Sequence, residues 1–269
     1  MVSDPIGTGP TASLPQHVPH VTTAQMVEVD RAMTQDFRIE LIQMMENAGR
    51  NLADLTRRRF LAGDPRSKRV IVLAGGGGNG GGALVAARRL HNWGASVIVL
   101  LGQPATAMAA VPGHQLDIVA RMSVPIEMSP YVKNLRSADV IIDGLIGYSL
   151  RGAPRGAVAD LIRWTNSRSV PVLALDVPSG VDTTTGTVFD PAICATATLT
   201  LALPKEGLYA PGIEKQTGEL YLADISVPPG SLRAAAFEHL PRATLRPGRS
   251  GPAAMMNIRV RSKTTNGRP

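Results

Sequence analysis

The sequence predicts a three-layer α/β fold with a mostly parallel, doubly wound sheet and an N-terminal helical extension. From residue 69 onward, short hydrophobic runs, typical of strands buried on both faces, alternate with segments of helical length. The 269 residues, of which 44% are hydrophobic and 27 are glycine, are enough for one large domain with its own core. The single cysteine, Cys194, excludes both an internal disulfide and a cysteine-built zinc site.

The N-terminal extension is predicted to contain two helices. Thr22–Gln25 matches a capping box, and Met26 and Met33 then fall on one face of the first helix. The second helix is predicted over about Ile39–Arg58, with a continuous apolar side. Gly49 within it costs about 1 kcal/mol relative to alanine, so we expect that close packing requires the small residue.

The remaining elements alternate between strand and helix. Strands are predicted at 69–74, 96–102, 138–143, 170–176, 197–203 and 219–227, with helices near 81–93, 107–121 and 156–167. Repeated strand–helix–strand units predict a parallel sheet with helices on both faces. We expect residues 21–240 to form one domain, residues 1–20 a disordered leader and residues 241–269 a disordered basic tail.

The net charge of +7 is located at the C-terminal end of the chain. Every charged residue beyond Leu240 is basic, namely Arg242, Arg246, Arg249, Arg259, Arg261, Lys263 and Arg268. Subtracting these seven from 28 leaves 21 Lys and Arg in residues 1–239, equal to the 21 Asp and Glu there. A short basic tail is typical of a solvated chain end, and nucleic-acid binding is the alternative that we do not expect.

Neither a targeting segment nor a membrane span is predicted. The first twenty residues lack the basic and apolar regions of a signal peptide. The longest apolar runs, such as residues 97–102, are far shorter than the roughly 20 residues that span a bilayer. We therefore expect a cytoplasmic protein.

A glycine cluster, Gly75–Gly82, follows the first predicted strand and is interrupted only by Asn79. Glycines let a backbone approach a phosphate, and the helix that follows favours negative charge at its N-terminus; a flexible turn is the alternative. The usual NAD site also needs a carboxylate at the end of the second strand, but residues 100–104 contain none, which disfavours an NAD-dependent oxidoreductase. The absence of Gly-Lys-Ser/Thr excludes an ordinary P-loop.

Two aspartates, Asp143 and Asp176, follow hydrophobic runs at the ends of predicted strands. A carboxylate there is costly unless it is paired, hydrogen-bonded or ion-bound, although each could instead cap a neighbouring loop or helix. Together with Asn79 and Ser179 at neighbouring strand ends, they predict an oxygen-rich pocket. Such oxygen ligands suit an alkali or alkaline-earth cation rather than zinc. The five histidines form no metal-binding spacing, and no Ser-His-Asp arrangement can be argued.

Five short motifs follow one another in order along residues 22–232. They are Met44–Arg50 (MMENAGR), Gly77–Arg88 (GGNGGGALVAAR), Asp143–Gly152 (DGLIGYSLRG), Leu175–Asp182 (LDVPSGVD) with Thr185 and Gly186, and Leu203–Leu208 (LPKEGL). This series resembles the NAD(P)H-hydrate epimerase family, also called the YjeF N-terminal domain.

The resemblance implies a Rossmann-like homodimer, an isomerase that interconverts the R and S forms of hydrated NADH or NADPH in nicotinamide nucleotide repair. Carried over position by position, it implies substrate-binding residues at Gly78, Asn79, Gly80, Gly81, Gly82, Gly147, Tyr148, Ser149, Leu150, Arg151, Gly152, Ala153 and Asp176. It also implies a potassium ion held by Asn79, Asp143 and Ser179.

The expected chemistry needs a proton donor. The C6 hydroxyl of the hydrate leaves with push from the ring nitrogen, and water returns from the opposite face. Hydroxide leaves poorly without a general acid, whose conjugate base then activates the returning water. Asp176 is the candidate for this role, because the resemblance places it against the substrate.

Two positions depart from the family pattern. Gly78 stands where the family has an asparagine, and Gly82 where it has an aspartate. The alternative function is therefore a non-catalytic nucleotide- or partner-binding module on the same scaffold. We expect a separate NAD(P)H-hydrate dehydratase to complete the repair.

Overall fold

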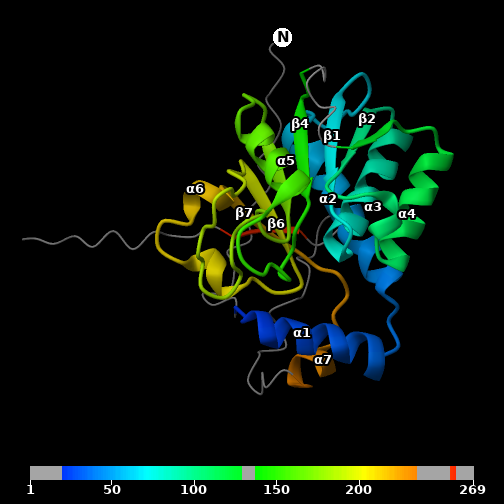
Figure 1. The fold of residues 1–269 in the computed structure, drawn as a ribbon. Coiled ribbons are helices and arrows are strands. Elements are labelled where there is room, and N and C mark those ends of the chain that lie inside the picture. The colour runs from blue at the N-terminus through cyan, green and yellow to red at the C-terminus, as the bar shows by residue number, and fades with distance from the viewer. Residues whose placement is uncertain (1–19, 129–136, 235–254, 259–269) are drawn as a thin grey trace, which may run out of the picture.

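Eight strands form one sheet in the order β3-β2-β1-β4-β5-β6-β7-β8 (Figure 1). The computed structural model describes residues 20–128, 137–234 and 255–258. The strands are β1 (Arg69–Ala74), β2 (Ser96–Leu101), β3 (Ile126–Met128), β4 (Val140–Gly144), β5 (Val172–Leu175), β6 (Ala197–Leu201), β7 (Glu219–Ala223) and β8 (Met255–Ile258). Strands β1 to β7 are parallel, and β8 pairs antiparallel with β7.

The helices lie on both faces of this sheet. They are α1 (Thr23–Arg31), α2 (Leu41–Phe60), α3 (Gly78–Asn92), α4 (Ala110–Arg121), α5 (Gly156–Asn166), α6 (Glu214–Thr217) and α7 (Pro229–Ala234), with shorter turns η1 (Ala32–Asp36), η2 (Ala105–Ala107) and η4 (Glu206–Tyr209). Buried side chains of α2, α3 and α4 pack on one face of the sheet, and Leu161 and Ile162 of α5 pack on the other. The predicted three-layer, doubly wound fold is therefore confirmed.

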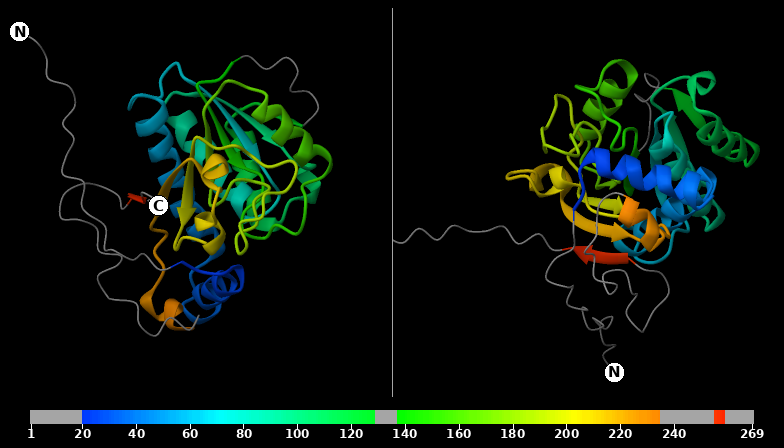
Figure 2. Two further views of the ribbon diagram at one scale, coloured as in Figure 1. Left: turned by 90° about the vertical axis from the view of Figure 1, so that its left-hand side faces the viewer. Right: turned by 90° about the horizontal axis from the view of Figure 1, so that it is seen from below.

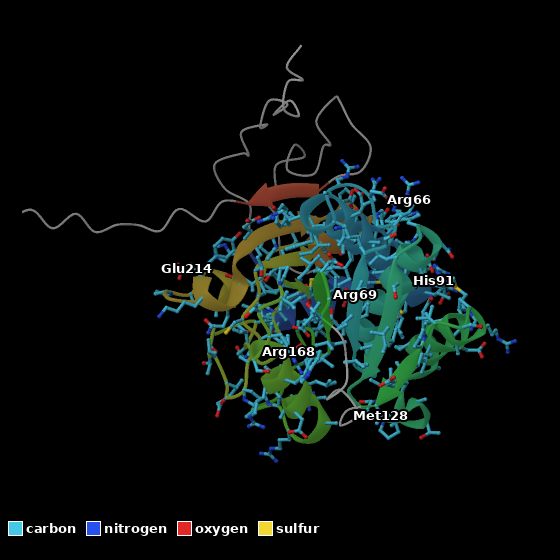
Figure 3. The ribbon with its side chains drawn as sticks, turned by 90° about the horizontal axis from the view of Figure 1, so that it is seen from above. Arg66, Arg69, His91, Met128, Arg168 and Glu214 are labelled. Carbon is cyan, nitrogen blue, oxygen red and sulfur yellow. The ribbon has the colours of Figure 1, made fainter. Side chains whose placement is uncertain are left out.

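The direction of winding reverses between β1 and β4. The chain first builds outward from β1 through β2 to β3, and then returns to place β4 on the other side of β1. Ligands of open α/β sheets bind beyond the carboxyl ends of the strands at such a switch point. Figure 3 views the molecule from the opposite end, where Arg69 opens β1 and Arg168 precedes β5.

Helix α1 crosses the molecule beneath the sheet, beside α7 (Figures 1 and 2). Its predicted capping box is present: the Thr22 side chain accepts from the Gln25 N–H, and the Gln25 side chain accepts from the Thr22 N–H. Just before it, the Val21 N–H donates to the Pro204 carbonyl at 2.9 Å, and Val21 forms a bridge with Lys205. The N-terminal extension is thereby fixed to the loop that follows β6.

Two strands were not predicted. Strand β3 has three residues, too few to show a pattern, and β8 lies within residues 241–269, where we expected no strand. The rest of that predicted tail, and residues 1–19 of the predicted leader, lie outside the described residues. In the described part of the chain, no helix is long and apolar enough to cross a membrane.

Candidate active site

A cavity of about 510 Å³ opens at the carboxyl ends of β1, β4 and β5. Its walls include the three strand-end segments Gly75–Asn79, Leu145–Ser149 and Leu175–Asp176. Helices α1 and α2 add an apolar side formed by Met26, Leu41, Met44, Met45 and Ala48. The cavity therefore occupies the switch point, and its size is that of a typical small-molecule site.

The glycine cluster forms the turn from β1 into α3. A Cβ atom at Gly80 would lie 1.8 Å from the Gly75 carbonyl oxygen, so the turn can close only with glycine there. Gly77 and Gly78, by contrast, have open space around the position of a Cβ atom. The first turn of α3 has no side-chain cap, so its free N–H groups face a position suited to an anionic group.

The structure divides the predicted substrate residues into two groups. Gly78, Asn79, Gly147, Tyr148, Ser149 and Asp176 line the cavity. Gly80, Gly81 and Gly82 are buried in α3 behind the cavity wall, where a Cβ atom at Gly81 would overlap the Met45 sulfur at 2.5 Å. Leu150, Arg151, Gly152 and Ala153 continue the loop beyond the cavity lining.

The departures Gly78 and Gly82 have different surroundings. Gly78 faces open space at the cavity, so its missing side chain leaves room for a ligand. A Cβ atom at Gly82 would lie 3.0 Å from the Leu175 side chain and 3.6 Å from the Ala48 Cβ atom. The carboxylate expected from the family pattern would have apolar neighbours at this second position.

Asp176 forms a buried ion pair with Lys205. The Lys205 ammonium donates to Asp176 Oδ1 and to the Leu201 carbonyl oxygen, the latter at 2.9 Å. Lys205 and Asp176 are only 1% and 4% exposed. Asp176 also has a positive φ of 66°, which costs a residue other than glycine roughly 1–2 kcal/mol and often marks a functional position.

A second carboxylate, Asp30 of α1, enters the same cavity. The Tyr148 hydroxyl donates a hydrogen bond to Asp30 Oδ2, whereas Oδ1 is buried with no hydrogen-bond partner among the described residues. Burial raises the pKa of Asp30, and the hydrogen bond from Tyr148 opposes this effect. Burial together with the neighbouring Asp30 charge also raises the pKa of Tyr148.

The three predicted cation ligands lie around the β4 and β5 ends. Ser179 donates to Asp143 through its hydroxyl (2.7 Å to Oδ1) and its N–H (2.8 Å to Oδ2), and the Leu145 N–H donates at 3.1 Å. The position of a Cβ atom on Gly147 lies 3.5 Å from Asn79 Oδ1. The two aspartates thus differ in their partners, because no basic side chain pairs with Asp143 in the described ranges.

These residues fit a monovalent cation with oxygen ligands. Asp143 is completely buried, and this burial raises its pKa to about 6 because only uncharged groups stabilise its ionised form. Asn79 Nδ2 is buried without a hydrogen-bond partner in residues 20–128, 137–234 or 255–258. Exchanging the nitrogen and oxygen of that amide would present an oxygen ligand instead. A bound cation would supply the positive counter-charge that the partners of the Asp143 carboxylate do not provide.

Sequence reasoning did not assign Asp30 or Lys205 to the site. A signal for Asp30 was present, since it follows Met26 by four residues and precedes Met33 by three, which places a carboxylate on the apolar face of α1. Lys205 lies within the motif Leu203–Leu208, but its pairing with Asp176, 29 positions earlier in the chain, has no local sequence signature.

Fold and cavity together define a doubly wound α/β protein with a ligand site of the kind used for nucleotides. The chain belongs to the family described as YjeF-related protein N-terminus, which matches residues 41–207. The resemblance seen in the sequence motifs is thereby confirmed.

Known relatives include single-activity and bifunctional proteins. The NAD(P)H-hydrate epimerase of Dehalogenimonas lykanthroporepellens is 43% identical over 83% of this chain and 89% of that protein. The NAD(P)H-hydrate epimerase of Limosilactobacillus fermentum is 33% identical over 76% of this chain and 95% of that protein. The bifunctional NAD(P)H-hydrate repair enzyme Nnr of Moorella thermoacetica is 34% identical over 84% of this chain, which spans only 43% of that enzyme.

The fold also has a close counterpart among solved structures. The crystal structure of yeast ynu0 (YNL200c) superposes with a TM-score of 0.74, over 90% of this chain and all of the yeast chain. At 23% identity, this likeness supports the fold.

Proposed function

We propose that this protein is an NAD(P)H-hydrate epimerase, which interconverts the R and S forms of hydrated NADH or NADPH. The observation that carries the proposal is the extent of the family match. Residues 41–207 include the three strand-end segments that line the cavity, together with Asp176 and Lys205. The 89% coverage of a single-activity epimerase supports the same reaction.

The cavity suits the nicotinamide end of such a substrate. Met26, Met44 and Met45 offer an apolar surface to a planar ring, and the open start of α3 offers N–H groups to a phosphate. Gly78, whose surroundings are open, leaves room for the ligand at the cavity wall.

The reaction needs both a proton donor and a proton acceptor. Loss of the C6 hydroxyl as water leaves a cationic ring, and addition of water to the opposite face requires a base to take the released proton. Asp176 was predicted to fill both roles. Its ion pair with Lys205 stabilises the ionised carboxylate, which supports the role of base and leaves the donor to be found.

We also propose a potassium ion bound by Asn79, Asp143 and Ser179. When bound, it would supply positive charge beside the cavity. The hydrogen bonds between Asp143 and Ser179 connect the loops that follow β4 and β5. A cation bound by these two residues would therefore hold both loops in place.

The proposal extends to the partners and compartment of the protein. We propose a homodimer that acts in the cytoplasm. A separate NAD(P)H-hydrate dehydratase would consume the S form, and the bifunctional Nnr relatives support this coupling.

The test uses a racemic mixture of the hydrates and an excess of dehydratase specific for the S form. We expect complete consumption when this protein is added, and a parallel reaction without it measures spontaneous epimerisation. A remaining R half would instead favour the non-catalytic binding module, which would bind the hydrate without converting it.

A further inference from the structure

Asp30 and Asp176 enter one cavity from different elements, and one has an uncharged partner whereas the other has a positively charged partner. Asp176 follows β5 and is paired with the Lys205 ammonium. Asp30 comes from α1 and has an uncharged partner, the Tyr148 hydroxyl, on one oxygen. Its other oxygen, Oδ1, is buried without a partner in the described part of the chain. A buried oxygen of this kind is satisfied when it carries a proton and donates it to a ligand.

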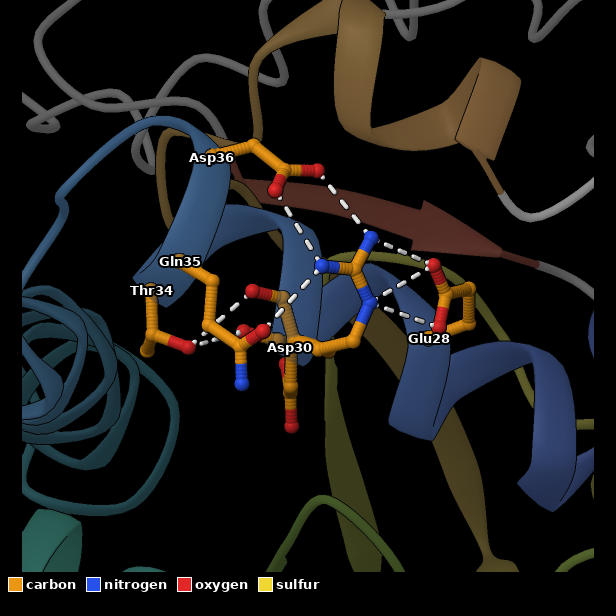
Figure 4. A network of polar contacts seen from close by, with 6 residues as sticks. Glu28, Asp30, Thr34, Gln35 and Asp36 are labelled. Atoms are coloured by element: carbon orange, nitrogen blue, oxygen red, sulfur yellow. Dashed lines mark hydrogen bonds and ion pairs between the residues drawn. The ribbon is translucent and has the colours of Figure 1, made fainter.

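The basic side chain beside Asp30 is engaged elsewhere. The Arg31 guanidinium is bound to Glu28 and Asp36, at 2.7 and 3.0 Å from its Nη2 atom. Dashed lines in Figure 4 mark these contacts at the labelled Glu28 and Asp36 carboxylates. The Thr34 hydroxyl donates to the Asp30 backbone carbonyl at 2.9 Å and does not contact the carboxylate. Helix α1 and turn η1 therefore provide no counter-charge for the Asp30 carboxylate.

The two charged groups that act on Asp30 from other elements have opposite effects on its pKa. Lys205, after β6, lowers the pKa of Asp30, and Asp176, after β5, raises it. Burial is the larger influence and favours the protonated form. A buried carboxyl group with an uncharged partner beside a carboxylate paired with an ammonium group is the usual arrangement of an acid and a base.

We propose that Asp30 is the proton donor of the epimerisation, positioned by Tyr148, and that ionised Asp176 is the proton acceptor. This inference rests on the proposed function. In the forward step, the C6–O bond breaks as the Asp30 proton passes to the leaving oxygen, releasing water and a cationic ring. A water molecule then adds to C6 from the other face and gives its proton to Asp176.

The same pair accounts for the reverse reaction. After one forward turnover Asp30 is ionised and Asp176 is protonated, which is the state required to convert the product back. Exchange of protons with solvent water restores the first state. Each epimer is therefore processed by one protonation state of the pair.

The first test compares Asp30→Asn with Glu28→Gln in the coupled epimerase assay. Asn keeps the shape of the side chain but carries no transferable proton at neutral pH, so kcat should fall by about 10²–10⁴-fold. Glu28 lies on the same helix, outside the cavity, and is bound to Arg31, so its variant should keep kcat within about twofold. Thermal melting of both variants and partial rescue by Asp30→Glu separate catalysis from folding.

The second test uses the pH dependence of kcat in Tyr148→Phe. An acid must be protonated, so the rate falls as the pH rises through the pKa of Asp30. The Tyr148 hydrogen bond lowers that pKa, and removing it should move the alkaline limb of the profile to higher pH. A wild-type protein that epimerises while Asp30→Asn stays within tenfold of it, or an unmoved alkaline limb, would overturn the inference alone. An inactive wild-type protein would overturn the proposed function as well.

Discussion

At the scale of single residues, the Asp176–Lys205 pair couples stability to chemistry. Removing one partner of a buried ion pair leaves an uncompensated charge and typically costs 3–5 kcal/mol. We expect Asp176→Asn and Lys205→Met each to lower the free energy of unfolding by about this amount, measured by urea denaturation. The double variant should be more stable than either single variant, because no isolated charge remains.

The double variant also separates the two roles of Asp176. Turnover should stay lost in it, since the base is absent, even though stability is regained. Additive losses of stability in the double variant would show that the two groups do not interact, and near-normal turnover would show that Asp176 is not the base.

The potassium proposal is tested at Asp143 by a measurement independent of activity. If a cation binds the folded protein there, replacing tetramethylammonium chloride by potassium chloride at equal ionic strength should raise the melting temperature. In Asp143→Asn, which discards the ligand charge, this increase should disappear, while Asp182→Asn serves as a control outside the proposed ligand set. Equal melting temperatures of the wild-type protein in both salts would contradict the proposal.

The site residues that could be predicted from the sequence are those with a recognisable pattern in the residues next to them. Asp143 and Asp176 were predicted because a carboxylate directly after a hydrophobic strand is unusual, and a few neighbouring residues are enough to recognise this pattern. The Asp30–Tyr148 contact joins residues 118 positions apart, and no local pattern encodes it. The roles assigned to the site residues stay predictions.

At the scale of elements, the contact between α2 and α3 confirms the interpretation of Gly49. A Cβ atom there would lie 2.4 Å from the Val85 Cβ atom and 2.5 Å from the Gly82 carbonyl oxygen. Strands β1, β2, β4, β5, β6 and β7 were predicted for a similar reason, since each is a hydrophobic run bounded by polar residues or turns. Strand β3 was missed because its three residues are all half-buried and carry no such run.

Two glycine-to-alanine variants test this contact. Alanine is a better helix former by about 1 kcal/mol, so Gly113→Ala in α4, where the nearest neighbour of a Cβ atom is 4.0 Å away, should be neutral or stabilising. Gly49→Ala should instead destabilise by about 1–3 kcal/mol, because the helices must move apart. Equal effects of the two variants on the unfolding midpoint would show that α2 and α3 can separate freely.

At the scale of the whole molecule, the topology places the cavity and strand β8 in different parts of the sheet. The cavity lies at β1, β4 and β5, and β8 pairs with β7 beyond β6. The parallel order was predictable from alternating strands and helices. The pairing of β8 was not, because a four-residue strand has little pattern of its own and is separated from β7 by more than 30 residues.

Truncation after Pro241 should therefore leave the reaction intact while lowering the solubility of the protein. The truncated chain lacks all seven basic residues beyond Leu240 and all of β8. We expect kcat/KM within about twofold of the full chain, because no residue of the cavity is removed. Solubility near neutral pH should fall, because the remaining chain has no net charge and β7 becomes an open edge.

A second truncation, after Ser262, separates charge from strand pairing. It keeps β8 and removes only two basic residues, Lys263 and Arg268, so it should remain as soluble as the full chain. Light scattering against protein concentration measures the association of both forms. Binding of the full chain to duplex DNA that weakens steeply with salt, and is lost on truncation after Pro241, would instead identify the basic segment as a nucleic-acid contact.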